Sequence, residues 1–279
     1  MMNRNNQEIR LQFKKSLNSG VTQQFPGAFN AMVGMLIEEH HFDGVYCSGA
    51  VASNSLGLSD TGLTTLSQVS LFVQQIVDKT NLPVVADADT GFENVAQTTQ
   101  EFEKIGCAGI HLEDQVDAKL CGHLDGKQLV STTEMVGKVR EAVKAKIDSN
   151  FQIIARTDAK SVEGIDAAID RAKAYVDAGA DVIFPEALHN EKEMELFRKA
   201  IDVPLLSNMT EFGKTELLTL NQIQNLGYNM VIYPVSMQRL AMMAVEKGLE
   251  SIKSSGSQKE IIEDMQTRKR LYEVLGYKK

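Results

Sequence analysis

The chain has 279 residues, of which 43% are hydrophobic, and its formal net charge is -8 at pH 7. This length and apolar content are enough to bury a full core, and the acidic balance argues against nucleic acid or an anionic membrane surface as the main partner. No apolar run approaches the roughly 18 residues of a membrane-spanning helix. Three cysteines without a CxxC pair predict a reducing, cytoplasmic location.

The first element is a basic stretch over residues 1–20, which predicts a short amphipathic helical segment. Eight short apolar runs follow, and each predicts a buried strand. They lie at 24–28, 44–48, 83–88, 109–114, 151–157, 181–186, 204–209 and 230–235. Between them, apolar residues at three- and four-residue spacing predict helices. Examples are 64–79, 94–105, 132–146, 164–178 and 191–200, and a further helix pattern covers 258–279.

The alternation of near-continuous apolar strands with helices predicts an α/β fold. It favours a (β/α)8 barrel of TIM type over an open parallel sheet. No linker rich in Pro, Gly or Ser interrupts the rhythm. We therefore expect a single barrel domain over residues 1–279, with a helical segment at 1–20 and a C-terminal helix at 258–279.

In such a barrel, catalytic groups lie at the carboxyl ends of the strands. Asp87 and Asp89 follow the third predicted strand and are two residues apart, so their carboxylates project to the same side of an extended backbone. Together with Glu113 on the next strand, acting through a water, they are ligands suited to Mg²⁺ or Mn²⁺. The alternative is a turn in which the aspartates only cap.

A second polar cluster, KLCGH, follows the fourth predicted strand. The thiol of Cys121 lies between Lys119 and His123, where it ionises more easily and can donate a proton. Gly122 allows the backbone to approach a ligand closely. The alternative is a surface loop with a half-buried cysteine. Zinc is not expected, because no second Cys or His lies at ligand spacing. We interpret His111, inside the fourth strand, as a core histidine rather than a ligand.

The order and spacing of these residues resemble the isocitrate lyase and phosphoenolpyruvate mutase superfamily over nearly the whole chain. The motifs are YCSGA (46–50), DADTGF (87–92), LEDQ (112–115), KxCGH (119–123), ARTDA (155–159), FPEA (184–187), NMTEFGKT (208–215), YPVS (233–236) and MQTRKRLYE (265–273).

Within that superfamily, the resemblance implies a carbon–carbon lyase. The expected reaction is an Mg²⁺-dependent, retro-aldol-type cleavage of the tricarboxylate 2-methylisocitrate to pyruvate and succinate, a step of propionate catabolism. It also implies a homotetramer in which the C-terminal helix is exchanged between subunits.

The resemblance further assigns roles to individual residues. Cys121 would protonate the succinate carbanion, with Lys119, His123 and Arg156 as the other catalytic residues. The substrate would be bound by Tyr46, Ser48, Gly49, Ala50, Gly122, Glu186, Asn208, Met209, Thr210, Arg239 and Arg268. Asp87 and Asp89 would hold the metal.

One position departs from the family pattern. The family loop usually reads KRCGH, and Leu120 replaces its arginine. Leucine supplies neither the fixed charge nor the fork of donors of an arginine. An oxaloacetate hydrolase or another lyase of 2-hydroxy dicarboxylates is therefore an alternative. A weakened homologue that binds metabolites without turnover is a second alternative.

Overall fold

The computed structural model describes residues 4–277, except 118, 121, 123 and 125. It contains eight strands at the predicted positions, each within two residues of the expected ends. They are β1 (Gln23–Pro26), β2 (Val45–Cys47), β3 (Val84–Asp87), β4 (Gly109–Glu113), β5 (Gln152–Thr157), β6 (Val182–Pro185), β7 (Leu206–Asn208) and β8 (Met230–Tyr233). The buried apolar runs of the sequence thus form strands, as predicted.

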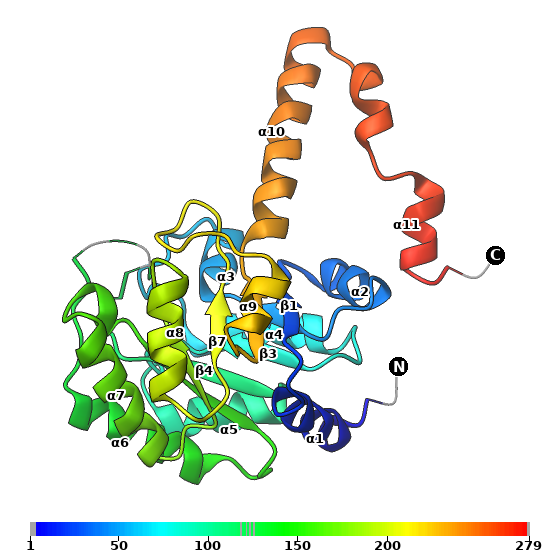
Figure 1. Cartoon of the computed structure of the whole chain (residues 1–279). Coiled ribbons are helices and arrows are strands. Elements are labelled where there is room, and N and C mark those ends of the chain that lie inside the picture. Colours follow the sequence, from blue (N-terminus) through cyan, green and yellow to red (C-terminus); the bar gives the residue numbers. More distant parts are fainter. Residues whose placement is uncertain (1–3, 118, 121, 123, 125, 278–279) are drawn as a thin grey trace.

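The strands pair in parallel and in chain order. β2 to β6 form one sheet, and β1, β8 and β7 form another. Two isolated parallel bridges, Gly27 to Tyr46 and Ile183 to Leu205, connect the sheets at both seams. The eight strands therefore follow one another around a closed ring, which agrees with the predicted barrel (Figure 1).

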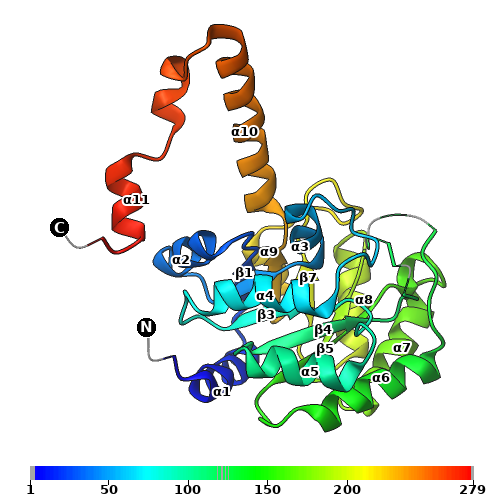
Figure 2. The same ribbon diagram turned by 180° about the vertical axis from the view of Figure 1, so that it is seen from behind.

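The helices of the described chain lie around this ring, except for the last two, which extend away from it (Figures 1 and 2). They are α1 (Asn6–Leu17), α2 (Ala31–Glu39), α3 (Gly49–Ser55), α4 (Leu66–Val77), α5 (Val95–Lys104), α6 (Thr132–Ala145), α7 (Ile165–Asp177), α8 (Glu191–Ala200), α9 (Leu220–Asn225), α10 (Ser236–Ser255) and α11 (Arg268–Val274), with 3-10 turns at Ala159–Ser161 and Lys259–Asp264. Side-chain caps fix several starts. Thr65 and Asn94, for example, accept hydrogen bonds from the backbone amides of Gln68 and Gln97.

Two apolar clusters hold the fold together. The larger lies between the strands and the surrounding helices, and the smaller fills the interior of the ring. Phe13 and Leu17 of α1 belong to the interior cluster, and the ring of Phe13 lies 5.3 Å from that of Phe25 on β1. The predicted N-terminal helix therefore packs onto the ring interior, and the polar residues that end the strands lie at the other end of the barrel.

The C-terminal region differs from the single helix predicted over 258–279. α10 ends at Gly256, whose φ of 67° is left-handed, and a 3-10 turn and the short α11 follow. The backbone is extended at Met265, and Thr267 caps a new helix, so the helical pattern is divided. This arm, residues 236–275, projects away from the barrel (Figures 1 and 2). No helix in the described part of the chain is long and apolar enough to cross a membrane.

Candidate active site

A cavity of about 270 Å³ opens among the residues that follow the strands. Its described lining includes twelve of the predicted site residues. They are Tyr46, Ser48, Ala50, Asp87, Glu113, Lys119, Gly122, Arg156, Glu186, Asn208, Thr210 and Arg239. These side chains come from separate strands and loops and lie up to 193 positions apart in the sequence. The barrel fold brings them together. We call this space the substrate cavity.

Asp87 and Asp89 are both buried at the end of β3. One oxygen of Asp87 accepts a hydrogen bond from the Gly49 amide at 2.9 Å, and the other accepts one from the Asp89 amide at 3.0 Å. The φ of Asp89 is 49° and that of Phe92 is 51°, so this short segment has two left-handed residues that are not glycine. Backbone of this kind persists where surrounding contacts impose it, and it is concentrated at functional sites.

The two carboxylates differ in proton affinity. Burial alone would raise the pKa of Asp87, but the neighbouring His111, Lys119 and Arg156 lower it below its usual range. Burial and the charge of Asp87 instead raise the pKa of Asp89 to about 6. The two carboxylates therefore repel each other, and a divalent cation between them would relieve that repulsion.

The donor set fits a hard divalent cation. A Cβ atom built on Gly49 would lie 2.9 Å from an oxygen of Asp87 and 2.9 Å from an oxygen of Asp89, so both carboxylates face one point. Glu113 Oε1 is buried without a hydrogen-bond partner. Among the described residues, no three His, Cys, Asp or Glu side chains form a preformed cage. The two facing carboxylates suit Mg²⁺, which commonly uses one or two carboxylates and completes its octahedron with water and substrate oxygens.

Lys119 connects two loops at the edge of the substrate cavity. Its buried ammonium forms an ion pair with Asp60 at 2.7 Å and a second with Asp89. Burial alone would lower the pKa of Lys119, but the carboxylates of Glu113, Asp89, Asp87 and Asp60 raise it well above its usual value. Lys119 therefore stays cationic. Asp60 was not predicted, because it lies on a loop whose path toward the site leaves no local signal in the sequence.

His111 is fully buried, as predicted, but it does more than fill the core. Its Nε2 atom lies 2.6 Å from the hydroxyl of Tyr46 and 3.2 Å from Oδ1 of Asp87. Its ring also stacks on Tyr46 and meets Phe184 edge-on. His111 therefore holds a predicted metal ligand and a residue of the cavity wall in place.

Arg156 lies at the centre of an acidic cluster. Its guanidinium bonds Asp158 in bidentate geometry at 2.9 and 3.1 Å, and it lies 3.3 Å from Glu113 and 3.5 Å from Glu186. It also lies over the ring of Phe184, 5.3 Å from its centroid. Burial would lower the pKa of Arg156, but these carboxylates raise it. The guanidinium is thus fixed in orientation. Asp158 and Phe184 were not among the predicted site residues.

The loop after β4 reaches the cavity at Gly122. A Cβ atom there would lie 2.4 Å from the Arg156 guanidinium and 2.5 Å from the Glu186 side chain, so glycine allows the backbone to approach these side chains closely. Lys127 donates a hydrogen bond to the carbonyl of Gly122 and one to Asp158. Cys121 and His123 lie outside the described residues.

Leu120, which departs from the family pattern, lines the cavity. The side-chain amide of Gln115 holds its backbone through two hydrogen bonds, of 2.9 Å to the Leu120 carbonyl and 3.0 Å from the Leu120 amide. These bonds do not involve the side chain at position 120. The leucine therefore changes the polarity of the cavity wall without changing the contacts that fix the backbone.

Two predicted substrate residues, Met209 and Arg268, lie outside the substrate cavity, and a third, Arg239, lies at its rim. Met209 belongs to the core between strands and helices, and its sulfur accepts a hydrogen bond from the Leu218 amide. Arg239 lines the cavity at its exposed rim, where it pairs with Glu211 at 3.0 Å. Arg268 is exposed on α11 and is absent from the described cavity lining. Strand alternation accounts for Met209, because its neighbours Asn208 and Thr210 face the cavity.

These features define an α/β-barrel protein whose site combines a pair of buried, facing carboxylates with a fixed arginine, a geometry suited to acidic metabolites. The family model for phosphoenolpyruvate phosphomutase matches residues 13–253. The chain belongs to this family, and the resemblance seen in the sequence is confirmed.

Named relatives share most of its length. The probable 2-methylisocitrate lyase 2 of Corynebacterium glutamicum is 51% identical over 273 residues, which cover 97% of this chain and 89% of the relative. The 2-methylisocitrate lyase of Escherichia coli K12 is 44% identical over 270 residues, covering 95% of this chain and 91% of the relative.

Solved structures share the fold. A 2,3-dimethylmalate lyase has a TM-score of 0.90 at 32% identity, with 96% of this chain and 91% of the other covered. An oxaloacetate acetylhydrolase bound to 3,3-difluorooxalacetate has a TM-score of 0.91 at 31% identity, with coverage of 97% and 94%. A phosphonopyruvate hydrolase in complex with oxalate and Mg²⁺ has a TM-score of 0.87 at 29% identity, with coverage of 96% and 94%.

Proposed function

We propose that the protein cleaves 2-methylisocitrate to pyruvate and succinate with the help of Mg²⁺. The observation that carries this proposal is the pair of facing carboxylates, Asp87 and Asp89, at the edge of the substrate cavity that Lys119 and Arg156 line. A metal-chelating hydroxy acid with several carboxylates matches that pattern of charge. Relatives named 2-methylisocitrate lyase, at 44% to 51% identity over almost the whole chain, support the same substrate.

Asp87 and Asp89 would hold the metal, with Glu113 bound through water. Mg²⁺ there supplies Lewis acidity, which lowers the pKa of a substrate hydroxyl and stabilises a developing carbonyl. A relative solved with oxalate and Mg²⁺ supports this cation. Mn²⁺ has similar ligand preferences and is expected to substitute for it.

The reaction requires the hydroxyl of the pyruvate half to give its proton to water or to a carboxylate of the site, the carbon–carbon bond to break, and the bonding pair to remain on the succinate half. That carbon then takes a proton, which we assign to the Cys121 thiol. Ser48, Gly49 and Ala50 at the start of α3, together with Tyr46, hold the pyruvate end. Asn208, Thr210 and Arg239 lie on the side that would hold succinate, while the buried Arg156 and Glu186 keep the site ordered.

Specificity is tested by comparing substrates on one enzyme preparation. We expect pyruvate and succinate from 2-methylisocitrate, with kcat/KM at least about tenfold above that for oxaloacetate or 2,3-dimethylmalate, since a missing carboxylate or methyl leaves site groups unpaired or space unfilled. A preference for oxaloacetate would place the protein with the hydrolases instead. Binding of all three compounds without turnover would identify a weakened homologue.

We also propose a homotetramer in which the projecting arm packs on another subunit. α10 has no buried residue over its 20 positions, although Leu240, Met243 and Leu249 on it are large and apolar. Apolar surface of this kind is typical of subunit interfaces. Arg268 on α11 would then belong to a site shared between copies. Cys47 and Cys107 are free and buried, which supports the proposed cytoplasmic location.

A further inference from the structure

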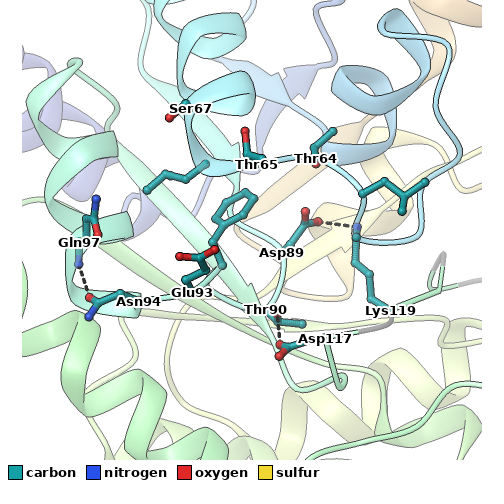
Figure 3. A pocket seen from close by; sticks show the side chains of 14 residues that line it. Thr64, Thr65, Ser67, Asp89, Thr90, Glu93, Asn94, Gln97, Asp117 and Lys119 are labelled. Atoms are coloured by element: carbon teal, nitrogen blue, oxygen red, sulfur yellow. Dashed lines mark hydrogen bonds and ion pairs between the residues drawn. The ribbon is translucent and has the colours of Figure 1, made fainter.

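A second cavity, of about 530 Å³ (Figure 3), shares the lining residue Lys119 with the substrate cavity. Its walls are the start of α4, the segment from Asp89 to Asn94 that leads into α5, and the loop residues Asp117 and Lys119. Among the described residues, Lys119 is the only one that lines both cavities. Asp89 lines the second cavity and Asp87 lines the substrate cavity, so the predicted metal ligands lie in the partition between them.

The second cavity runs from solvent to Asp89. Ser67, Glu93 and Asn94 are exposed at its outer edge, whereas Thr90 and Asp89 are buried at its inner end. Figure 3 shows Asp89 and Lys119 on one side of the cavity, with Ser67 and Asn94 on other sides. An ion at the point that both aspartates face would therefore be within reach from either cavity.

The charge of this lining favours cations over the substrate. Asp89, Glu93 and Asp117 contribute three carboxylates, and the single ammonium, Lys119, is already paired with Asp60 and Asp89. The described lining of the substrate cavity holds three cations, two of them arginines, against the four carboxylates of Asp60, Asp87, Glu113 and Glu186. The second lining is the more acidic of the two, so it repels a tricarboxylate more strongly and attracts a divalent cation more strongly.

Two helices begin at the second cavity, and free helix amides would favour an anion there. One amide at each helix start is bonded to its capping side chain. Thr65 Oγ1 accepts the Gln68 amide in a capping box, and Asn94 Oδ1 accepts the Gln97 amide at 2.8 Å. The hydroxyl and amide groups that remain can supply oxygen atoms to a partly hydrated cation.

We propose that the second cavity is a passage through which the divalent metal reaches and leaves Asp89 independently of the substrate cavity. This inference rests on the metal of the proposed function. A substrate that chelates the metal from the substrate cavity, with Gly122 against Arg156 and Glu186, would block exit on that side. The passage keeps metal exchange possible while substrate or product is bound.

The test measures Mn²⁺ exchange on the full chain, with oxalate added to fill the substrate cavity. Free Mn²⁺ is followed by electron paramagnetic resonance, as loss of its signal after mixing for entry and as return of its signal after excess Mg²⁺ is added for release. Ser67→Trp narrows the outer opening, and we expect entry and release to slow by the same factor, about tenfold, with the Kd for Mn²⁺ unchanged. That equality distinguishes a blocked passage from a damaged binding site, and turnover at saturating Mg²⁺ should stay at the wild-type value.

Glu93→Lys tests whether the carboxylates that line the passage attract the divalent cation. We expect Mn²⁺ entry to slow about tenfold at low salt and less at high salt. Glu141→Lys, the same change at an exposed position on α6, is the control and should leave both rates unchanged. Unaltered Mn²⁺ rates in Ser67→Trp would overturn the passage, whether or not kcat/KM for the substrate falls. Failure of the wild type to bind Mn²⁺ would instead overturn the metal assignment of the proposed function.

Discussion

The mouth of the barrel and the C-terminal arm are organised in opposite ways. At the mouth, charged side chains are buried and each contacts several others, as Arg156 does with Asp158, Glu113 and Glu186. On α10, large apolar side chains are exposed and no residue is buried. Buried charge without pairing is costly, and so is exposed apolar area. At the mouth, ion pairs within one chain offset the cost of burying charge. On the arm, the exposed apolar side chains need contact with another surface.

We expect the largest effect from a substitution in the aspartate pair at the barrel mouth. Asp87→Asn keeps the shape and removes one charge, and we expect kcat to fall about 10³-fold because the metal's contribution is worth several kcal/mol. Calorimetric titration with Mn²⁺ should show binding lost or greatly weakened. Asp177→Asn, an exposed change at the end of α7, serves as the control. Full turnover in Asp87→Asn would remove Asp87 from the metal site.

The next largest effect is expected at Asp114, which we expect to contribute to stability, unlike its neighbour Glu113 in the substrate cavity. Asp114 faces the helix layer, where it accepts hydrogen bonds from Thr157 at 2.8 Å and Tyr175 at 2.7 Å and lies 3.6 Å from Arg171. We expect Asp114→Asn to lower the free energy of unfolding by about 3 kcal/mol, because a buried ion pair loses one partner.

Urea unfolding followed by circular dichroism measures that change, with the exposed Asp170→Asn on α7 as control. The Kd for Mn²⁺ should be unaffected by Asp114→Asn. A weaker Mn²⁺ affinity at unchanged stability would show that Asp114 belongs to the metal site rather than to the contacts that join the strands to the helix layer.

A third prediction concerns the arm. Leu249 is 64% exposed in the single chain. If another subunit covers it, Leu249→Glu should weaken association by about 2 kcal/mol, or about 30-fold in the subunit dissociation constant. Sedimentation equilibrium measures this, with Glu250→Gln as the matched control. A wild-type protein that sediments as a single copy would contradict the proposed exchange.

The smallest effect is expected at Leu120. Because Gln115 fixes the backbone there, Leu120→Arg should restore a guanidinium without moving the loop, and kcat/KM for 2-methylisocitrate should rise by about tenfold. Leu124→Arg, an exposed position of the same loop, controls for added charge. A decrease in kcat/KM for Leu120→Arg would mean that the leucine itself fits the substrate.

Much of the fold could be predicted because its signals are local. The strands were found from short apolar runs, and helix starts such as those after Thr65 and Asn94 carry capping residues. Strand ends also predicted Asp87, Glu113 and Arg156, since parallel strands in a barrel share one catalytic face.

The rest depends on tertiary structure. Asp60 reaches Lys119 from a loop 59 positions away, and nothing near it in the sequence indicates that path. His111 was interpreted as core from its place inside a strand, yet the pairing of β3 with β4 sets its ring against Asp87. The break in the tail at Gly256 and Met265 was missed because an amphipathic pattern continues across it.

The most direct test of the proposed function is pyruvate release from 2-methylisocitrate by enzyme stripped with EDTA, before and after Mg²⁺ is added back, for the wild type and Asp87→Asn. The proposal predicts no release from stripped enzyme, full recovery of the wild type with Mg²⁺, one succinate for each pyruvate, and no recovery of Asp87→Asn. Release that is independent of the metal, or equal in both proteins, would contradict it.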